Sequence, residues 1–153
     1  MTMISLVNNL LPLIFLFNCS SSSILVNKSL NEEIIQCSPN RTVTIELSNG
    51  YSKKTVSYEE GIIETFTFSD SSCIFIFCGR MQTLPILIKD KYQVVETKDE
   101  TGVMSRSGAN LETSKLWRED NYKSGITIVY DNVPKSRLTE FNSMMESVEI
   151  KEQ

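Results

Sequence analysis

Thr42-Val43-Thr44-Ile45-Glu46-Leu47 shows the clearest structural pattern in the chain, because polar and apolar side chains alternate along it without interruption. Successive side chains of a β-strand point to opposite faces of a sheet, so the three apolar side chains are expected on one buried face. Asn49-Gly50 follows directly and is a strong signal for a hairpin turn. Residues 53–58 are the expected return strand.

Strand patterns continue beyond this predicted hairpin. Residues 73–78 are apolar throughout, which indicates a central strand covered on both faces. Pro85 places the run 84–88 at a sheet edge or a bulge. Residues 98–113 are polar and rich in Ser and Gly, so a long mobile loop is expected there. The remaining expected strands are 64–68, 92–97 and a hairpin of 114–119 with 126–130.

A helical period is found only near the C-terminus. After Val133-Pro134, the apolar residues Leu138, Phe141, Met145 and Val148 recur at three- and four-residue spacing, which predicts a helix of about 13 residues. Such a helix must bury its apolar stripe against the sheet. The expected fold is therefore α+β, with a mostly antiparallel sheet of six to eight strands and one C-terminal helix packed on a face.

Composition limits the classes of function. The 153 residues suit one domain, and the net charge of -4 provides no basic footprint for nucleic acid. The chain has no histidine, which removes the commonest general base and the commonest neutral metal ligand. Motifs for a nucleophile elbow, for a phosphate-binding loop and for paired zinc-binding cysteines are absent from the sequence. We therefore expect no catalytic residues, no metal and no cofactor.

The N-terminus has the pattern of an export signal. Residues 1–18 carry no charged side chain, and the apolar run Leu10–Phe17 is too short to cross a bilayer but has the length of a signal-peptide core. Cys19 and four serines follow. Over about residues 1–25 the chain resembles bacterial lipoprotein precursors. The resemblance implies a signal peptide at 1–18, lipid attachment at Cys19, membrane anchoring and a location in the cell envelope.

Two alternatives remain at this end of the chain. Asn18 departs from the small residue that lipoprotein precursors prefer before the cysteine, so secretion without acylation is one alternative. No basic residue precedes the apolar run, since the first is Lys28, so a buried N-terminal strand of a cytoplasmic protein is the other. With the export interpretation, residues 19–32 are a flexible tether and residues 33–153 form a single α+β domain.

The cysteines constrain the fold in one respect. Cys73 and Cys78 lie five apart in one expected strand, so their Cα atoms would be roughly 16 Å apart, which is too far for a disulfide. Cys37 is able to pair with either of them in an oxidising compartment. Buried free thiols are the alternative.

Aromatic and basic residues near the second predicted hairpin form a candidate interaction surface, because such residues are enriched among interface anchors. The alternative is that Trp117 and Tyr130 pack beneath the helix. The expected function is a non-catalytic, membrane-anchored or secreted envelope protein that binds a protein or small ligand, as inhibitors, immunity proteins and assembly accessories do. A hydrolase using carboxylates or a Ser-Lys pair, and a cytoplasmic binding protein, are the alternatives. The candidate surface consists of Trp117, Tyr122, Tyr130 and Arg118 at the hairpin, together with Arg106 in the expected loop 98–113.

Overall fold

The computed structural model describes residues 29–59, 61–79, 94–123 and 125–152. The predicted signal peptide, Cys19, most of the tether and the strand expected at 84–88 lie outside these residues. The tether was predicted to reach residue 32, but the first strand begins at Leu30.

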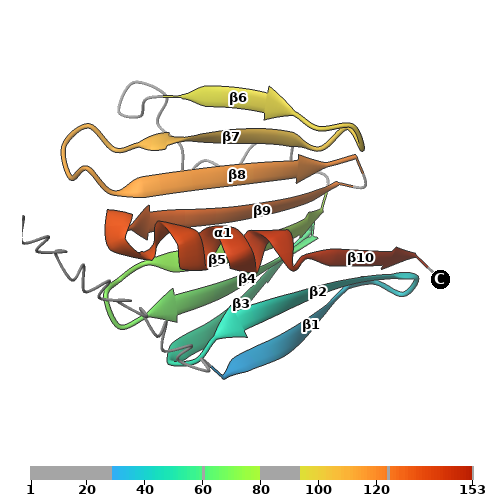
Figure 1. Cartoon of the computed structure of the whole chain (residues 1–153). Helices are drawn as coiled ribbons and strands as arrows, with labels where there is room; N and C mark the ends of the chain where they lie inside the picture. The colour runs from blue at the N-terminus through green and yellow to red at the C-terminus, as the bar shows by residue number, and fades with distance from the viewer. Residues whose placement is uncertain (1–28, 60, 80–93, 124, 153) are drawn as a thin grey trace, which may run out of the picture.

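The strands form two antiparallel sheets (Figure 1). The three-stranded small sheet has the order β1-β2-β10, and the seven-stranded large sheet has the order β3-β4-β5-β9-β8-β7-β6. The small sheet contains β1 (Leu30–Ser38), β2 (Arg41–Ser48) and β10 (Glu149–Glu152). The large sheet contains β3 (Tyr51–Tyr58), β4 (Gly61–Phe68), β5 (Cys73–Gly79), β6 (Val95–Lys98), β7 (Met104–Ala109), β8 (Leu116–Tyr122) and β9 (Ile126–Val133).

The α+β class, the antiparallel pairing and the C-terminal helix are confirmed, whereas the prediction of one sheet of six to eight strands is wrong. The two sheets make a sandwich. At Asn49-Gly50 the chain leaves β2 for β3, and these two strands belong to different sheets. The prediction of a hairpin is therefore wrong, because β2 and β3 do not pair with each other, although both strands are present. A local turn signal indicates that the chain reverses, but it does not specify which strand each partner pairs with.

The core lies between the two sheets. Val43, Ile45 and Leu47 of β2 are each 0 % exposed, as their alternation predicted, and they pack in one cluster with residues of β4, β5 and β9. Phe141 and Met145 of the helix α1 (Leu138–Glu146) join the same cluster. β5 lies between β4 and β9 in the sheet, so the prediction of a central strand is confirmed.

The helix is shorter than the predicted 13 residues, because α1 has nine and follows a 3-10 turn at Lys135–Arg137. Ser147 accounts for its end. The Ser147 Oγ donates to the Met144 carbonyl at 2.7 Å and accepts the backbone N–H of Glu46 at 2.9 Å. These bonds hold the chain against β2, where β10 then pairs. Val148 therefore lies outside the helix.

The region 98–113 contains a strand, so the prediction of one long loop there is wrong. β7 pairs with both β6 and β8 and is half-buried along its whole length. Its Ser and Gly residues are typical of a loop, and pairing with two neighbouring strands overrides that local preference. The predicted hairpin of β8 and β9 and the strand near 92–97 are present, the latter as β6 at Val95–Lys98.

Candidate functional site

A groove runs beside α1 over the half of the large sheet formed by β6, β7 and β8. Directly paired residues of antiparallel strands share one face of a sheet. The register places Val95, Ser107, Arg118 and Tyr130 in one row across β6, β7, β8 and β9. Tyr130 belongs to the core between the sheets, so the whole row lies on the face that α1 also occupies.

A second row continues this surface one step along the strands. It consists of Thr97, Ser105, Asp120 and Ile128, on the same face of the sheet. Together with α1, the first row and the β6 and β7 members of the second row line a groove of about 570 Å³, which we call the helix–sheet groove. This volume is within the range of small-ligand sites, about 300 to 1,000 Å³. The lining includes Val95, Thr97, Ser105, Ser107, Leu116, Trp117, Arg118, Tyr130 and the helix residues Leu138 and Asn142.

Arg118 supplies the strongest hydrogen-bond donor in the groove. Its Nε lies 2.9 Å from Oδ1 of Asp120, and its Nη2 lies 2.8 Å from Oδ2, so the pair is bidentate. The Asp120 side chain is 3 % exposed and that of Arg118 is 23 % exposed. Burial opposes the charge, but hydrogen bonding and attraction to Asp120 raise the pKa of Arg118 above its ordinary value. The buried Asp120 carboxylate therefore positions the Arg118 guanidinium, and the side of the guanidinium away from Asp120 is exposed to water.

The wall of the groove is fixed by a contact between the sheet and the helix. The Tyr130 hydroxyl donates to Oδ1 of Asn142 at 3.1 Å, and the Tyr130 ring meets the Phe141 ring edge-on at 5.7 Å between centroids. Burial raises the pKa of Tyr130 to about 12, so its hydroxyl is protonated at neutral pH. Both contacts connect β9 to α1 and so position this wall of the groove.

The structure divides the five residues of the candidate interaction surface between the two faces of the large sheet. Arg118, Tyr122 and Tyr130 share the face toward α1. Trp117 lies between Leu116 and Arg118, so alternation turns it to the opposite face, where it is 1 % exposed. Tyr130 packs beneath the helix as the alternative stated, whereas Trp117 does not.

Arg106 is on the opposite face as well. It is paired in register with Glu96 and Glu119, and its Nε lies 2.8 Å from Oε2 of Glu96. Tyr122 lies at the other end of β8 from the helix–sheet groove, beside Lys123 and Ile150 in a second hollow of about 530 Å³. The five residues therefore do not form one continuous surface.

The sequence did not indicate the small residues that form the floor of the groove. Ser105 and Ser107 alternate with Met104, Arg106 and Gly108, a two-residue period that signals a strand. The pattern was obscured because the residues that alternate with the serines are a mixture of apolar, charged and small residues rather than a run of apolar ones. Asn142 lines the groove only because α1 packs against β9, which no local pattern reveals.

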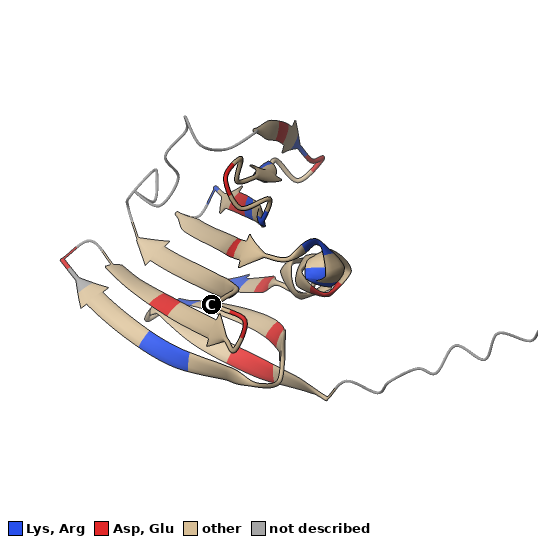
Figure 2. Cartoon of the chain, turned by 90° about the vertical axis from the view of Figure 1, so that its left-hand side faces the viewer, with Lys and Arg blue, Asp and Glu red and all other residues tan. Residues whose placement is uncertain are grey.

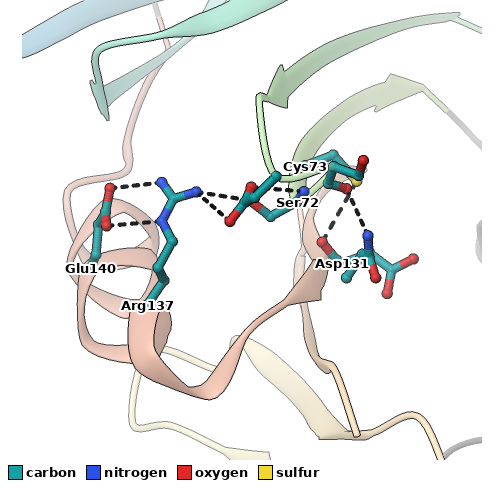
Figure 3. Close-up of polar contacts among 8 residues, drawn as sticks. Ser72, Cys73, Asp131, Arg137 and Glu140 are labelled. Atoms are coloured by element: carbon teal, nitrogen blue, oxygen red, sulfur yellow. Dashed lines mark hydrogen bonds and ion pairs between the residues drawn. The ribbon is translucent and has the colours of Figure 1, made fainter. Parts of the chain in front are cut away.

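A second polar cluster connects the start of α1 to the turn between β4 and β5 (Figure 3). The Arg137 guanidinium donates to Asp70, Ser72 and Glu140 at distances of 2.9 to 3.1 Å. It also lies 4.8 Å from the ring centroids of both Phe68 and Phe141. Burial opposes the Asp70 charge, but hydrogen bonds from Ser72 and Arg137 lower the pKa of Asp70 to about 2. Because every partner belongs to the protein, this cluster holds elements together.

Cys37 and Cys78 form a disulfide, and Cys73 is free. This agrees with the prediction that Cys73 and Cys78 do not bond to each other. The Cys73 thiol contacts the Asp131 carbonyl at 3.7 Å, and burial together with the nearby Asp131 carboxylate raises the pKa of the thiol to about 12. A thiol in this environment is a poor nucleophile at neutral pH.

The described residues bring together no group of three or more Cys, Asp or Glu side chains able to hold a metal ion. None of the helices in the described ranges is long and apolar enough to cross a membrane. Acidic and basic residues are interspersed over the described elements rather than gathered into one basic surface (Figure 2).

Comparison with known proteins adds no relative. No protein-family model matches the chain, and no curated protein and no solved structure matches it.

Proposed function

We propose that this chain is a non-catalytic binding protein of the cell envelope, anchored through an acylated Cys19, and that its helix–sheet groove receives the ligand. The observation that carries the proposal is the Arg118–Asp120 pair, whose partly exposed guanidinium lies on the floor of an open groove. Ligand sites commonly combine apolar walls with a few fixed polar groups. The groove has that character, with Leu138 and Val95 beside Arg118 and Asn142.

The Cys37–Cys78 disulfide supports the proposed location. Disulfides persist in oxidising compartments and are rare in reducing ones. This bond joins β1 to β5 and so connects the two sheets. The apolar run ahead of Cys19 supports the same location. Mass spectrometry of the intact protein purified from membranes tests this location. We expect a mass that corresponds to a chain without residues 1–18 and with acyl chains on Cys19. An unprocessed soluble chain would contradict export.

Photo-crosslinking tests the binding role of the groove. A photoreactive amino acid replaces Ser107 on the floor of the groove, and in a matched control it replaces Ser52, an exposed residue of β3. After irradiation of cells that naturally make the chain, we expect a discrete adduct at position 107 and none at 52. The mass of the adduct reports its chemical class. Absence of any adduct at position 107, or equal labelling at both positions, would contradict a binding role for the groove.

A further inference from the structure

We propose that the helix–sheet groove binds an extended, uncharged peptide segment with aliphatic side chains, supplied by a partner protein. The inference rests on the proposed function and names the chemistry of its ligand. Three features of the groove carry it: the compensated charge of Arg118, the small polar groups of β6 and β7, and the covered aromatic rings.

The first feature is that the charge of Arg118 is already compensated. Asp120 occupies Nε and Nη2, and among the described residues the structure gives Nη1 no partner. Water reaches these N–H groups in the free protein, and a ligand that displaces the water must supply an acceptor, because an unpaired buried donor costs free energy. An anionic ligand would be repelled by Asp120 at the same place. An uncharged acceptor such as a peptide carbonyl satisfies Nη1 without that repulsion.

The second feature is the pattern of small polar groups beside Arg118. The hydroxyls of Thr97, Ser105 and Ser107 line the groove, and none of them has a hydrogen bond to another described residue. Each hydroxyl donates one hydrogen bond and accepts others. A peptide backbone presents donors and acceptors in turn along its length, which suits such a row. Val95 and Leu138 offer apolar contacts to its side chains.

The third feature distinguishes a peptide from a saccharide, whose rings stack on exposed aromatic faces. Tyr130 is 2 % exposed, and its ring packs against Phe141. Trp117 is 1 % exposed. The described lining of the groove therefore presents no open aromatic face. The apolar part of the lining is aliphatic instead, and it is able to pack against aliphatic side chains of a peptide. It consists of Leu138, Leu116 and Val95.

The test is selection from a phage-displayed library of random peptides on the full-length chain, purified in mild detergent with its disulfide intact. Ser107→Phe fills the groove, and Ser52→Phe makes the same change at an exposed position of β3. We expect enriched peptides to share uncharged, aliphatic sequences, to bind wild type and Ser52→Phe alike, and to lose binding to Ser107→Phe. Val95→Arg, at a rim residue that is 55 % exposed, should also block binding without disturbing the core.

Arg118→Lys then tests the role assigned to the guanidinium. Lysine keeps the charge beside Asp120 but lacks the planar fork, so the selected peptides should bind about tenfold more weakly. Thermal unfolding of each variant shows whether it is folded. The inference is overturned if no peptide is enriched, if the selected sequences are acidic, or if both Ser107→Phe and Val95→Arg bind them as wild type does.

The two proposals fail separately. A crosslinked adduct of non-peptide mass at position 107, together with no peptide enrichment, removes the peptide inference and leaves the binding role. No adduct at position 107 removes the binding role itself.

Discussion

Arg137 is the residue that attaches the helical segment to the large sheet. Its guanidinium lies 4.8 Å from the ring centroids of both Phe68 and Phe141 and donates to Asp70 and Glu140. A guanidinium is suited to this position because it is planar, permanently charged and able to stack on aromatic faces while it hydrogen-bonds at its edge. One side chain thus connects the β4–β5 turn, the core and the first turn of α1.

Replacing Arg137 by alanine should therefore destabilise the protein more than a surface charge deletion does. The loss combines two ring contacts with hydrogen bonds to two carboxylates, and we expect about 1 to 2 kcal/mol in the free energy of unfolding. Lys135→Ala, at an exposed residue in the same 3-10 turn, should stay within about 0.5 kcal/mol of wild type. Urea denaturation measures both. Equal effects of the two changes would show that the Arg137 contacts add no stability.

At the scale of elements, the small sheet is assembled from distant parts of the chain. β10 pairs with β2 across about a hundred residues, and Ser147 brings it there by ending α1 against the β2 backbone. β1 is tied to β5 of the other sheet by the Cys37–Cys78 bond. The small sheet therefore depends on cross-connections as well as on its own ladder.

The disulfide should contribute strongly to stability. It closes a segment with a sequence separation of 41, for which the chain-entropy model gives about 4 kcal/mol, because the bond restricts the unfolded chain. The double change Cys37→Ala and Cys78→Ala should lower the free energy of unfolding by about that amount in urea. Cys73→Ala leaves the bond intact, and we expect it to cost about 1 kcal/mol or less. A double variant as stable as Cys73→Ala would show that the core alone holds the sheets together.

At the scale of the molecule, the two layers are unequal. The small sheet and α1 pack on β4, β5 and β9, while β6 is exposed and β7 is half-buried. A core of limited size needs to cover only part of a large sheet, and the remaining face can carry polar side chains. The helix–sheet groove is a consequence of this mismatch.

Acid stability of the whole fold should depend on Asp70. Hydrogen bonds from Ser72 and Arg137 outweigh burial and lower its pKa to about 2 in the folded state, below the ordinary value of 3.8. Its contribution is therefore complete above about pH 4 and is lost as the pH falls toward 2. Asp70→Asn should cost about 1 kcal/mol at pH 7, since water screens this exposed pair, and the difference from wild type should shrink toward zero near pH 2.

Comparing wild type with Asp70→Asn separates the contribution of Asp70 from the contributions of other carboxyl groups. Glu33 has a lowered pKa as well, because hydrogen bonds from Tyr51 and Lys53 outweigh its burial, and it adds a loss in the same direction. Burial raises the pKa of Asp131, so protonation of Asp131 relieves a cost as the pH falls. Both effects are common to wild type and Asp70→Asn. A difference that stays constant from pH 7 to pH 2 would contradict the role of Asp70.

Local patterns predicted most elements correctly where large apolar residues mark the period. The alternation at 42–47 predicted the buried face of β2, the run 73–78 predicted a central strand, and Leu138 and Phe141 marked the helix. β7 was missed because its serines alternate with a mixture of residue types, so no alternation of polar and apolar residues marks it as a strand. The groove was missed with it, since Ser105 and Ser107 form its floor.

By itself, the sequence determined the strands that large apolar residues mark, the position of the helix and the buried face of β2, because these follow from the spacing of apolar side chains along a short stretch. Only the tertiary structure decided that β2 and β3 belong to different sheets, that Cys37 pairs with Cys78, and that Asn142 faces Arg118 across one groove. The physical reason is that these contacts join residues far apart in the sequence. A local pattern specifies which face of a strand or helix is buried, but it does not specify which element packs against that face.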